Sequence, residues 1–146
     1  IIFLLQAEID SRNIMNILRG VREGLPSDEI TSYLIPGGSL SPTILEKMAE
    51  ADDVFSALSH IQDRFDLKEA QEAFDETNSL APLEVTLERA IVERGLKAFQ
   101  RSILSLGALV GFIYLKEEEV KNIRKIIRAK EYNIPLDKVR EMLVLT

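Results

Sequence analysis

The sequence predicts an all-α fold built from helical repeat modules. Apolar residues recur every three to four positions over most of the 146 residues, which is the spacing of amphipathic helices. No stretch alternates apolar and polar residues for long enough to form a strand. The five prolines and seven glycines gather where such helices would begin and end.

The first predicted helix runs to about Glu23. Its apolar stripe consists of Ile9, Ile14, Ile17, Leu18 and Val21. Gly24 suits the left-handed conformation that ends many helices. Pro26 then opens a short helix that runs through Leu34 and has two acidic residues in its first turn, where the free N–H groups of a helix start stabilise carboxylates.

Caps and breakers predict three short helices in the middle of the chain. Pro36-Gly37-Gly38 forms a loop, and Ser41-Pro42 is typical of an N-cap followed by the first helical residue, with the helix ending near Ala51. Asp52 or Asp53 caps a second short helix through Ser59. The third covers residues 67–76, before a break at residues 79–82.

Two long helices and one short helix complete the prediction. The first long helix carries the apolar residues from Leu83 to Phe99, and residues 102–107 interrupt it. The longest helix follows, over residues 106–132, with Ser105 as its cap. Asn133 and Pro135 end it, and a last short helix covers residues 136–143.

The chain contains an internal repeat with an offset of 109 residues. This shift lays residues 1–35 over residues 110–144, and nine of the 35 pairs are identical. The identical pairs are Phe3/Phe112, Glu8/Glu117, Asn13/Asn122, Ile14/Ile123, Ile17/Ile126, Arg19/Arg128, Pro26/Pro135, Asp28/Asp137 and Leu34/Leu143. Gly24 matches Asn133, and these two residue types tolerate a left-handed cap. We therefore expect one unit, a long helix, a proline turn and a short helix, to occur twice.

The repeat also predicts the domain organisation. By the same shift the first helix should begin three or four residues before Ile1, so we expect the chain to start inside a helix of a larger repeat protein. Residues 1–104 would form a helical module with a truncated first helix. Residues 105–146 would form the start of a second repeat packed against it.

Three pairs of equivalent polar residues are candidates for fixing the geometry of each copy. Arg19 and Asp28 are nine residues apart, as are Arg128 and Asp137. Each arginine lies in the last turn of a long helix and each aspartate in the first turn of a short one, so we predict an ion pair across each proline turn. Asn13 and Asn122 lie beside the apolar stripes, where a buried amide bonded to a neighbouring loop is expected.

Composition limits the function classes. The absence of cysteine and the single histidine, His60, argue against thiol catalysis, thiolate metal sites and a two-histidine mechanism. Glu117-Glu118-Glu119 lacks the partners of an acid–base site, so we interpret it as a solvated run in which Glu117 pairs with Lys121. We predict no catalytic, cofactor-binding or metal-binding residues, no cofactor and no small-molecule substrate. The longest apolar stretch, residues 103–115, is shorter than the roughly 18–20 residues that a spanning helix needs.

Charge is unevenly distributed along the chain. The formal net charge is −6 and the isoelectric point about 4.9, which argues against a nucleic-acid partner. Residues 37–97 carry 6 basic and 13 acidic groups, whereas residues 98–146 carry 9 basic and 6 acidic groups. Five cations lie on the last long helix: Lys121, Arg124, Lys125, Arg128 and Lys130. They form either a docking surface for an acidic partner or lipid headgroups, or a solvated helix face with cations near its C-terminus.

The two copies resemble a known family. The segment Leu5-Gln-Ala-Glu-Ile-Asp-Ser-Arg-Asn-Ile-Met-Asn-Ile-Leu-Arg-Gly and its counterpart from Tyr114 to Lys130 are similar to the C subunit of archaeal and bacterial A/V-type ATPases, a relative of the eukaryotic V-ATPase d subunit. Pro36-Gly37-Gly38, Pro82-Leu83-Glu84 and the lead-in from Ile103 to Tyr114 also fit. The resemblance is strongest over residues 5–38 and 103–140.

The resemblance implies a non-catalytic coupling part. Family members are longer and consist of three related helical modules arranged as a funnel, of which this chain would cover a C-terminal part. Such a subunit links the rotating central stalk to the membrane proteolipid ring during proton or sodium transport. The implied partners are the stalk subunits and the ring, and the implied location is peripheral, on the cytoplasmic side of the membrane.

Two alternative functions follow from the residues alone. A free-standing helical-repeat adaptor would bind an unrelated protein in a concave surface. An enzyme with a helical pocket would need a deep cleft with several perturbed carboxylates, and the sequence offers no pair of nucleophile and base for it.

Overall fold

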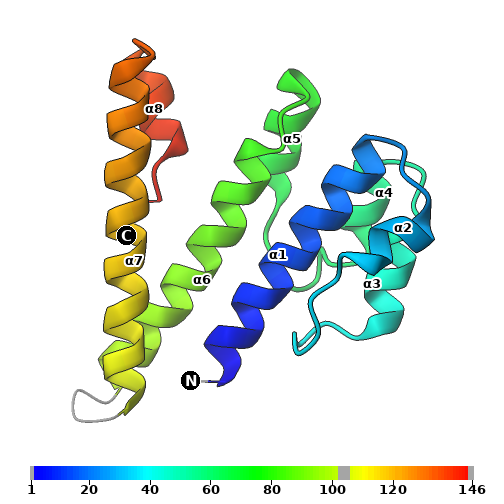
Figure 1. Cartoon of the computed structure of the whole chain (residues 1–146), viewed down its shortest axis with the longest axis horizontal. Coiled ribbons are helices and arrows are strands. Elements are labelled where there is room, and N and C mark those ends of the chain that lie inside the picture. The colour runs from blue at the N-terminus through cyan, green and yellow to red at the C-terminus, as the bar shows by residue number, and fades with distance from the viewer. Residues whose placement is uncertain (1, 102–105, 145–146) are drawn as a thin grey trace. The chain divides into compact units, whose positions relative to one another are not determined.

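The computed structural model describes residues 2–101 and 106–144, and every regular element in these ranges is an α-helix (Figure 1). The predicted all-α class is confirmed. These residues form two compact units, which divide between Glu84 and Val85, inside one helix. The predicted division between residues 104 and 105, and the predicted cap Ser105, lie outside the described residues. That division stays a prediction.

The first unit, Ile2–Glu84, is organised around helix α1 (Ile2–Arg22). Helices α2 (Ser27–Ser32), α3 (Pro42–Ala49) and α4 (Val54–Ser59) pack against it. They lie along the same side of α1 in Figure 1. Helix α5 (Lys68–Thr77) and the first residues of α6 (Ala81–Arg101) complete the unit. The α1 stripe supplies the centre of its core: Leu4, Ile14, Ile17 and Leu18 are fully buried.

The second unit holds the rest of α6, from Val85, and helices α7 (Leu106–Glu131) and α8 (Leu136–Met142). Helix α8 packs back against α7. None of the described helices is both long and apolar enough to cross a membrane.

Caps and breakers act as the sequence predicts. The side chains of Ser41 and Asp53 accept hydrogen bonds from the backbone N–H groups of Ile44 and Ser56, at 3.4 and 2.7 Å. Two residues after the end of α1, Gly24 has a φ of 70°, and two residues after the end of α7, Asn133 has a φ of 52°. These left-handed residues let the chain turn back within two residues of each proline.

The segments related by the 109-residue shift make the same backbone hydrogen bonds. The N–H of Leu25 donates to the carbonyl of Gly20 at 3.0 Å, and the N–H of Ile134 donates to the carbonyl of Ala129 at 2.9 Å. Four further pairs of bonds correspond in the same way; their donors are Glu23/Tyr132, Gly24/Asn133, Ile30/Val139 and Leu34/Leu143. Both stretches therefore form one local structure of long helix, left-handed stop and short helix.

Candidate functional site

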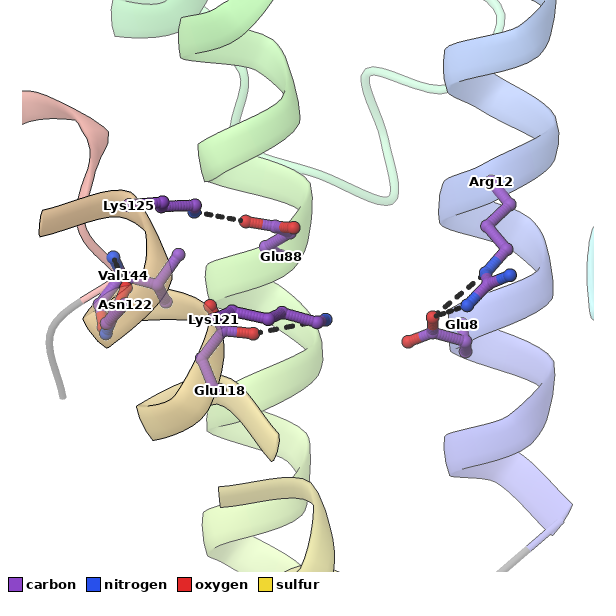
Figure 2. Close-up of polar contacts among 8 residues, drawn as sticks. All are labelled: Glu8, Arg12, Glu88, Glu118, Lys121, Asn122, Lys125 and Val144. Atoms are coloured by element: carbon purple, nitrogen blue, oxygen red, sulfur yellow. Dashed lines mark hydrogen bonds and ion pairs between the residues drawn. The ribbon is translucent and has the colours of Figure 1, made fainter. Parts of the chain in front are cut away.

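Helix α7 carries the predicted docking cations, and the structure divides them into two groups. The Lys125 ammonium donates to Glu88 Oε2 of α6 at 3.0 Å. The Lys121 ammonium lies 3.3 Å from Glu118 Oε2, one turn earlier on α7 (Figure 2). Both lysines are half-buried, so ion pairs inside this unit already engage them.

The other three cations of the set remain on the surface. Arg124, Arg128 and Lys130 are exposed, and the ion pairs found between described residues include none of them. Exposed, unneutralised cations are the ones that attract an acidic partner over a distance. The candidate docking surface therefore reduces to these three side chains.

Glu118 corrects the interpretation of the acidic run as wholly solvated. Its side chain is only 7% exposed, and its Oε1 atom is buried without a hydrogen-bond partner. Burial raises the pKa of this carboxyl above its usual 4.5, the Lys121 ammonium partly opposes that rise, and the nearby Glu88 carboxylate adds to it. Glu117 and Glu119 are exposed, as predicted.

The predicted pairing of Glu117 with Lys121 is replaced by the pairing of Glu118 with Lys121. In the other copy the equivalent residues do pair, since Arg12 donates to Glu8 at 2.9 Å (Figure 2). The difference has a physical cause. An unpaired carboxylate destabilises the fold far more when it is buried than when it is exposed. Glu118 is the buried one, and it occupies the position of the apolar Ile9 in the first copy.

Glu88 and Glu118 are the residues of this region that the sequence interpretation missed. Glu118 could have been found, because the repeat alignment places an acidic residue opposite Ile9 of the apolar stripe. Glu88 could not, since its role depends on how α6 and α7 meet, and no local pattern specifies that.

Both predicted asparagine amides bond to a neighbouring segment; Asn13 is buried, as predicted, whereas Asn122 is half-buried. Asn13 donates to the carbonyl of Ile35 at 2.8 Å and accepts from the N–H of Ile35 at 2.7 Å. Asn122 makes the same two bonds to Val144, at 2.7 and 3.2 Å. Each asparagine thus clamps the segment that leaves the short helix onto the middle of the long helix.

The two ion pairs predicted across the proline turns are not found between the described residues. Arg19 donates to Glu84 Oε1 of α6 at 3.1 Å. Between described residues, no ion pair joins Arg19 to Asp28 or Arg128 to Asp137. Each aspartate lies in the first turn of its helix, where free N–H groups stabilise a carboxylate without an arginine.

An open hollow of about 610 Å³ lies beside α3 and α4. Phe55, Ser59 and His60 are among the residues that line it. His60 is the C-cap residue of α4 and is exposed. Asp53, the N-cap residue of α4, has a lowered pKa, caused first by its hydrogen bond from the Ser56 N–H. Helix capping therefore explains this shift of the pKa.

Comparison with known proteins identifies the family. The sequence model described as ATP synthase (C/AC39) subunit matches residues 3–142. The chain belongs to this family. The resemblance of the two repeat segments is therefore confirmed over nearly the whole chain.

Relatives with curated names agree with this family. The chain is 31% identical over 140 residues to the C subunit of the A-type ATP synthase of Methanocaldococcus jannaschii, covering 93% of this chain and 35% of the relative. It is 35% identical over 138 residues to that of Pyrococcus horikoshii, with 92% and 37% covered. It is 33% identical over 144 residues to that of Halorubrum lacusprofundi, with 97% and 41% covered. The chain thus spans 35–41% of the length of these relatives. No solved structure matches it.

Proposed function

We propose that this chain is a non-catalytic part of the central stalk of a rotary A/V-type ATPase. In this role it couples the rotor of the ATPase sector to the membrane proteolipid ring, for proton or sodium transport. Membership of the ATP synthase (C/AC39) subunit family carries the proposal. The relatives, named as C subunits of A-type ATP synthases, favour the archaeal class of complex.

The charges of α7 support a contact role. Arg124, Arg128 and Lys130 are exposed on one helix of a chain whose net charge is −6. A local cationic surface on an acidic protein orients it toward an acidic partner and speeds the encounter. We assign these three side chains to docking on a stalk or ring subunit, and we place the protein at the membrane surface on the cytoplasmic side.

The test is affinity capture of the tagged chain from membranes that contain an A-type ATP synthase, followed by peptide identification. Stalk subunits should be recovered with the wild-type chain. The Arg124→Ala, Arg128→Ala, Lys130→Ala triple variant should recover about tenfold less, because it removes the steering charge. The matched control is Lys47→Ala, Arg64→Ala, Lys68→Ala, which removes three exposed cations of the first unit and should retain full recovery.

Other outcomes would replace the proposal. Enrichment of an unrelated protein without stalk subunits would favour a free-standing helical-repeat adaptor. Equal loss with both triple variants would show that net charge, and not the α7 surface, determines binding.

A further inference from the structure

Glu118 is a buried carboxylate whose two oxygens are unequally satisfied. Its side chain is 7% exposed, and its Oε2 lies 3.3 Å from the Lys121 ammonium (Figure 2). Its Oε1 is buried and has no hydrogen-bond partner. A charged carboxylate in such a place loses water without gaining a full set of donors, so burial favours the neutral, protonated form. For this reason the pKa of Glu118 is raised above 4.5.

Three charged side chains act on Glu118. Lys121 lies one turn further along α7, Lys125 lies two turns further, and Glu88 belongs to α6. Among the described residues, helix α8, which also packs against α7, adds none. The Lys125 ammonium donates to Glu88 Oε2 at 3.0 Å. The two carboxylates and two ammonium groups thus have no net charge together, and protonation of Glu118 changes their sum to one positive charge.

This group of four charges borders the docking cations of α7. Residues three and four apart are neighbours on a helix surface, so Arg124 lies beside Lys121 and Arg128 lies beside Lys125. Glu118 precedes Arg124 by six residues, which is about 9 Å along the helix axis. That separation is close to the screening length of about 10 Å in 0.1 M salt. The charge of Glu118 therefore lowers the positive potential at the nearest docking cation.

We propose that Glu118 is a proton-dependent switch of the docking surface. While its carboxylate is charged, it offsets the Lys121 ammonium, and the surface presents its three exposed cations. When Glu118 takes up a proton, this offset is lost and the local charge of α7 rises by one. The surface then binds an acidic partner more tightly, and by linkage such a partner tightens the binding of the proton. This switch rests on the docking role of α7 proposed above.

Binding of a strong polyanion at different pH values tests the switch. Low-molecular-weight dextran sulfate is the probe, because its sulfate esters stay charged throughout the range. Its dissociation constant is measured for the wild-type chain and for Glu118→Gln, which is neutral at every pH, from about pH 8 down to about pH 5. Glu117→Gln, which removes one charge at an exposed neighbouring position, is the matched control. Circular dichroism verifies that each variant is folded.

At the upper end of the range Glu118→Gln should bind the probe about three- to tenfold more tightly than the wild-type chain, because it lacks the offsetting charge. This advantage should disappear as the pH falls through the pKa of Glu118, since the wild-type side chain then becomes neutral as well. Any advantage of Glu117→Gln should persist at that pH. In the Arg124→Ala, Arg128→Ala, Lys130→Ala background the pH-dependent advantage should be absent.

The wild-type chain also offers a test that needs no variant. Calorimetry in two buffers of different ionisation enthalpy should show proton uptake when the probe binds near the pKa of Glu118. Binding without proton uptake would overturn the switch.

Two results with the variants would also overturn it. A constant ratio of the dissociation constants of Glu118→Gln and the wild-type chain would show that the charge of Glu118 does not reach the docking surface. An equal pH dependence in the triple variant would show that other cations bind the probe. The probe takes the place of a stalk subunit, so the absence of stalk subunits in the capture experiment would overturn the stalk assignment and leave the switch standing.

Discussion

Gly20 of α1 and Ile30 of α2 are matched in size. A β-carbon on Gly20 would lie 2.6 Å from Ile30 Cγ1, closer than van der Waals contact allows. In the other copy the equivalent residues are Ala129 and Val139, both buried. The first copy thus pairs glycine with isoleucine. The second copy pairs alanine, which is larger by a methyl group, with valine, which is smaller by a methylene group.

This match predicts that Gly20→Ala destabilises the first unit although alanine is the better helix former. Overpacking should lower the free energy of unfolding by about 1–2 kcal/mol. Adding Ile30→Val should recover part of this loss, because valine lacks the Cδ1 atom, which would lie 2.9 Å from the added β-carbon, while it keeps Cγ1. Urea denaturation of both single variants and the double variant measures the coupling. Additive losses would show that the two side chains do not compete for the same space.

The asparagine clamps predict comparable costs in the two copies. Asn13→Ala should lower the free energy of unfolding by about 2–4 kcal/mol, because it leaves both backbone groups of Ile35 without this partner. Asn122→Ala should cost a similar amount, because Asn122 is half-buried but Val144, whose two backbone groups lose their partner, is only 3% exposed. Asn16→Ala is the control, because Asn16 has only a 3.5 Å contact with the Tyr33 carbonyl. A loss at Asn16 as large as that at Asn13 would contradict this account.

Asp10 holds the start of the segment before α3, and its loss should open that segment. The buried carboxylate accepts hydrogen bonds from the Ser39 N–H at 2.9 Å, the Ser39 hydroxyl at 2.5 Å and the Leu40 N–H at 3.1 Å. Asp10→Asn should cost about 1–3 kcal/mol because the amide group presents donors toward donors. Ser39→Ala, which leaves both N–H bonds in place, should cost less. Amide exchange at Leu40 reports the opening.

Gly38 is predicted to be intolerant of a side chain for a related reason. A β-carbon there would collide with Asp10 Oδ1, so Gly38→Ala should disturb the same hydrogen bonds. The expected result is faster exchange of the Leu40 amide and a lower midpoint of thermal unfolding. Gly24→Ala serves as a comparison, since nothing lies within 4 Å of a β-carbon at Gly24. Any loss of stability in Gly24→Ala would come only from placing alanine at a φ of 70°.

Glu118 predicts a pH dependence of stability. Its carboxyl titrates near 4.5 in the unfolded chain, and burial raises the pKa in the folded chain. Between these two values the folded chain binds more protons, so the free energy of unfolding falls as pH rises through this window. Glu118→Gln removes the titration. The stability difference should therefore shift in favour of the variant as the pH rises above 4.5. Glu119→Gln, at an exposed position, is the control and should show no comparable shift.

Much of this fold could be predicted from the sequence because its signals are local. Gly24 and Asn133 mark left-handed stops, and Ser41 and Asp53 mark helix starts, through chemistry confined to a few neighbouring residues. The partners of Arg19 and Lys121 could not be predicted in this way. Glu84 lies 65 residues from Arg19, and Lys121 pairs with Glu118 because burial of that carboxylate outweighs helical spacing. Of the five predicted docking cations, the sequence cannot distinguish the three exposed ones from the two already in ion pairs.

The asparagine clamps bind only backbone atoms, and this leaves the clamped residues free to differ. Any residue except proline at position 35 or 144 offers the N–H and carbonyl that the amide requires. The side chains at these two positions can consequently differ in their surroundings: Ile35 is 38% exposed, whereas Val144 is 3% exposed. A module held by such clamps can be copied and then diverge in its outer loop without losing the path of its chain. The asparagine therefore holds the path of the chain whatever side chain stands at the clamped position.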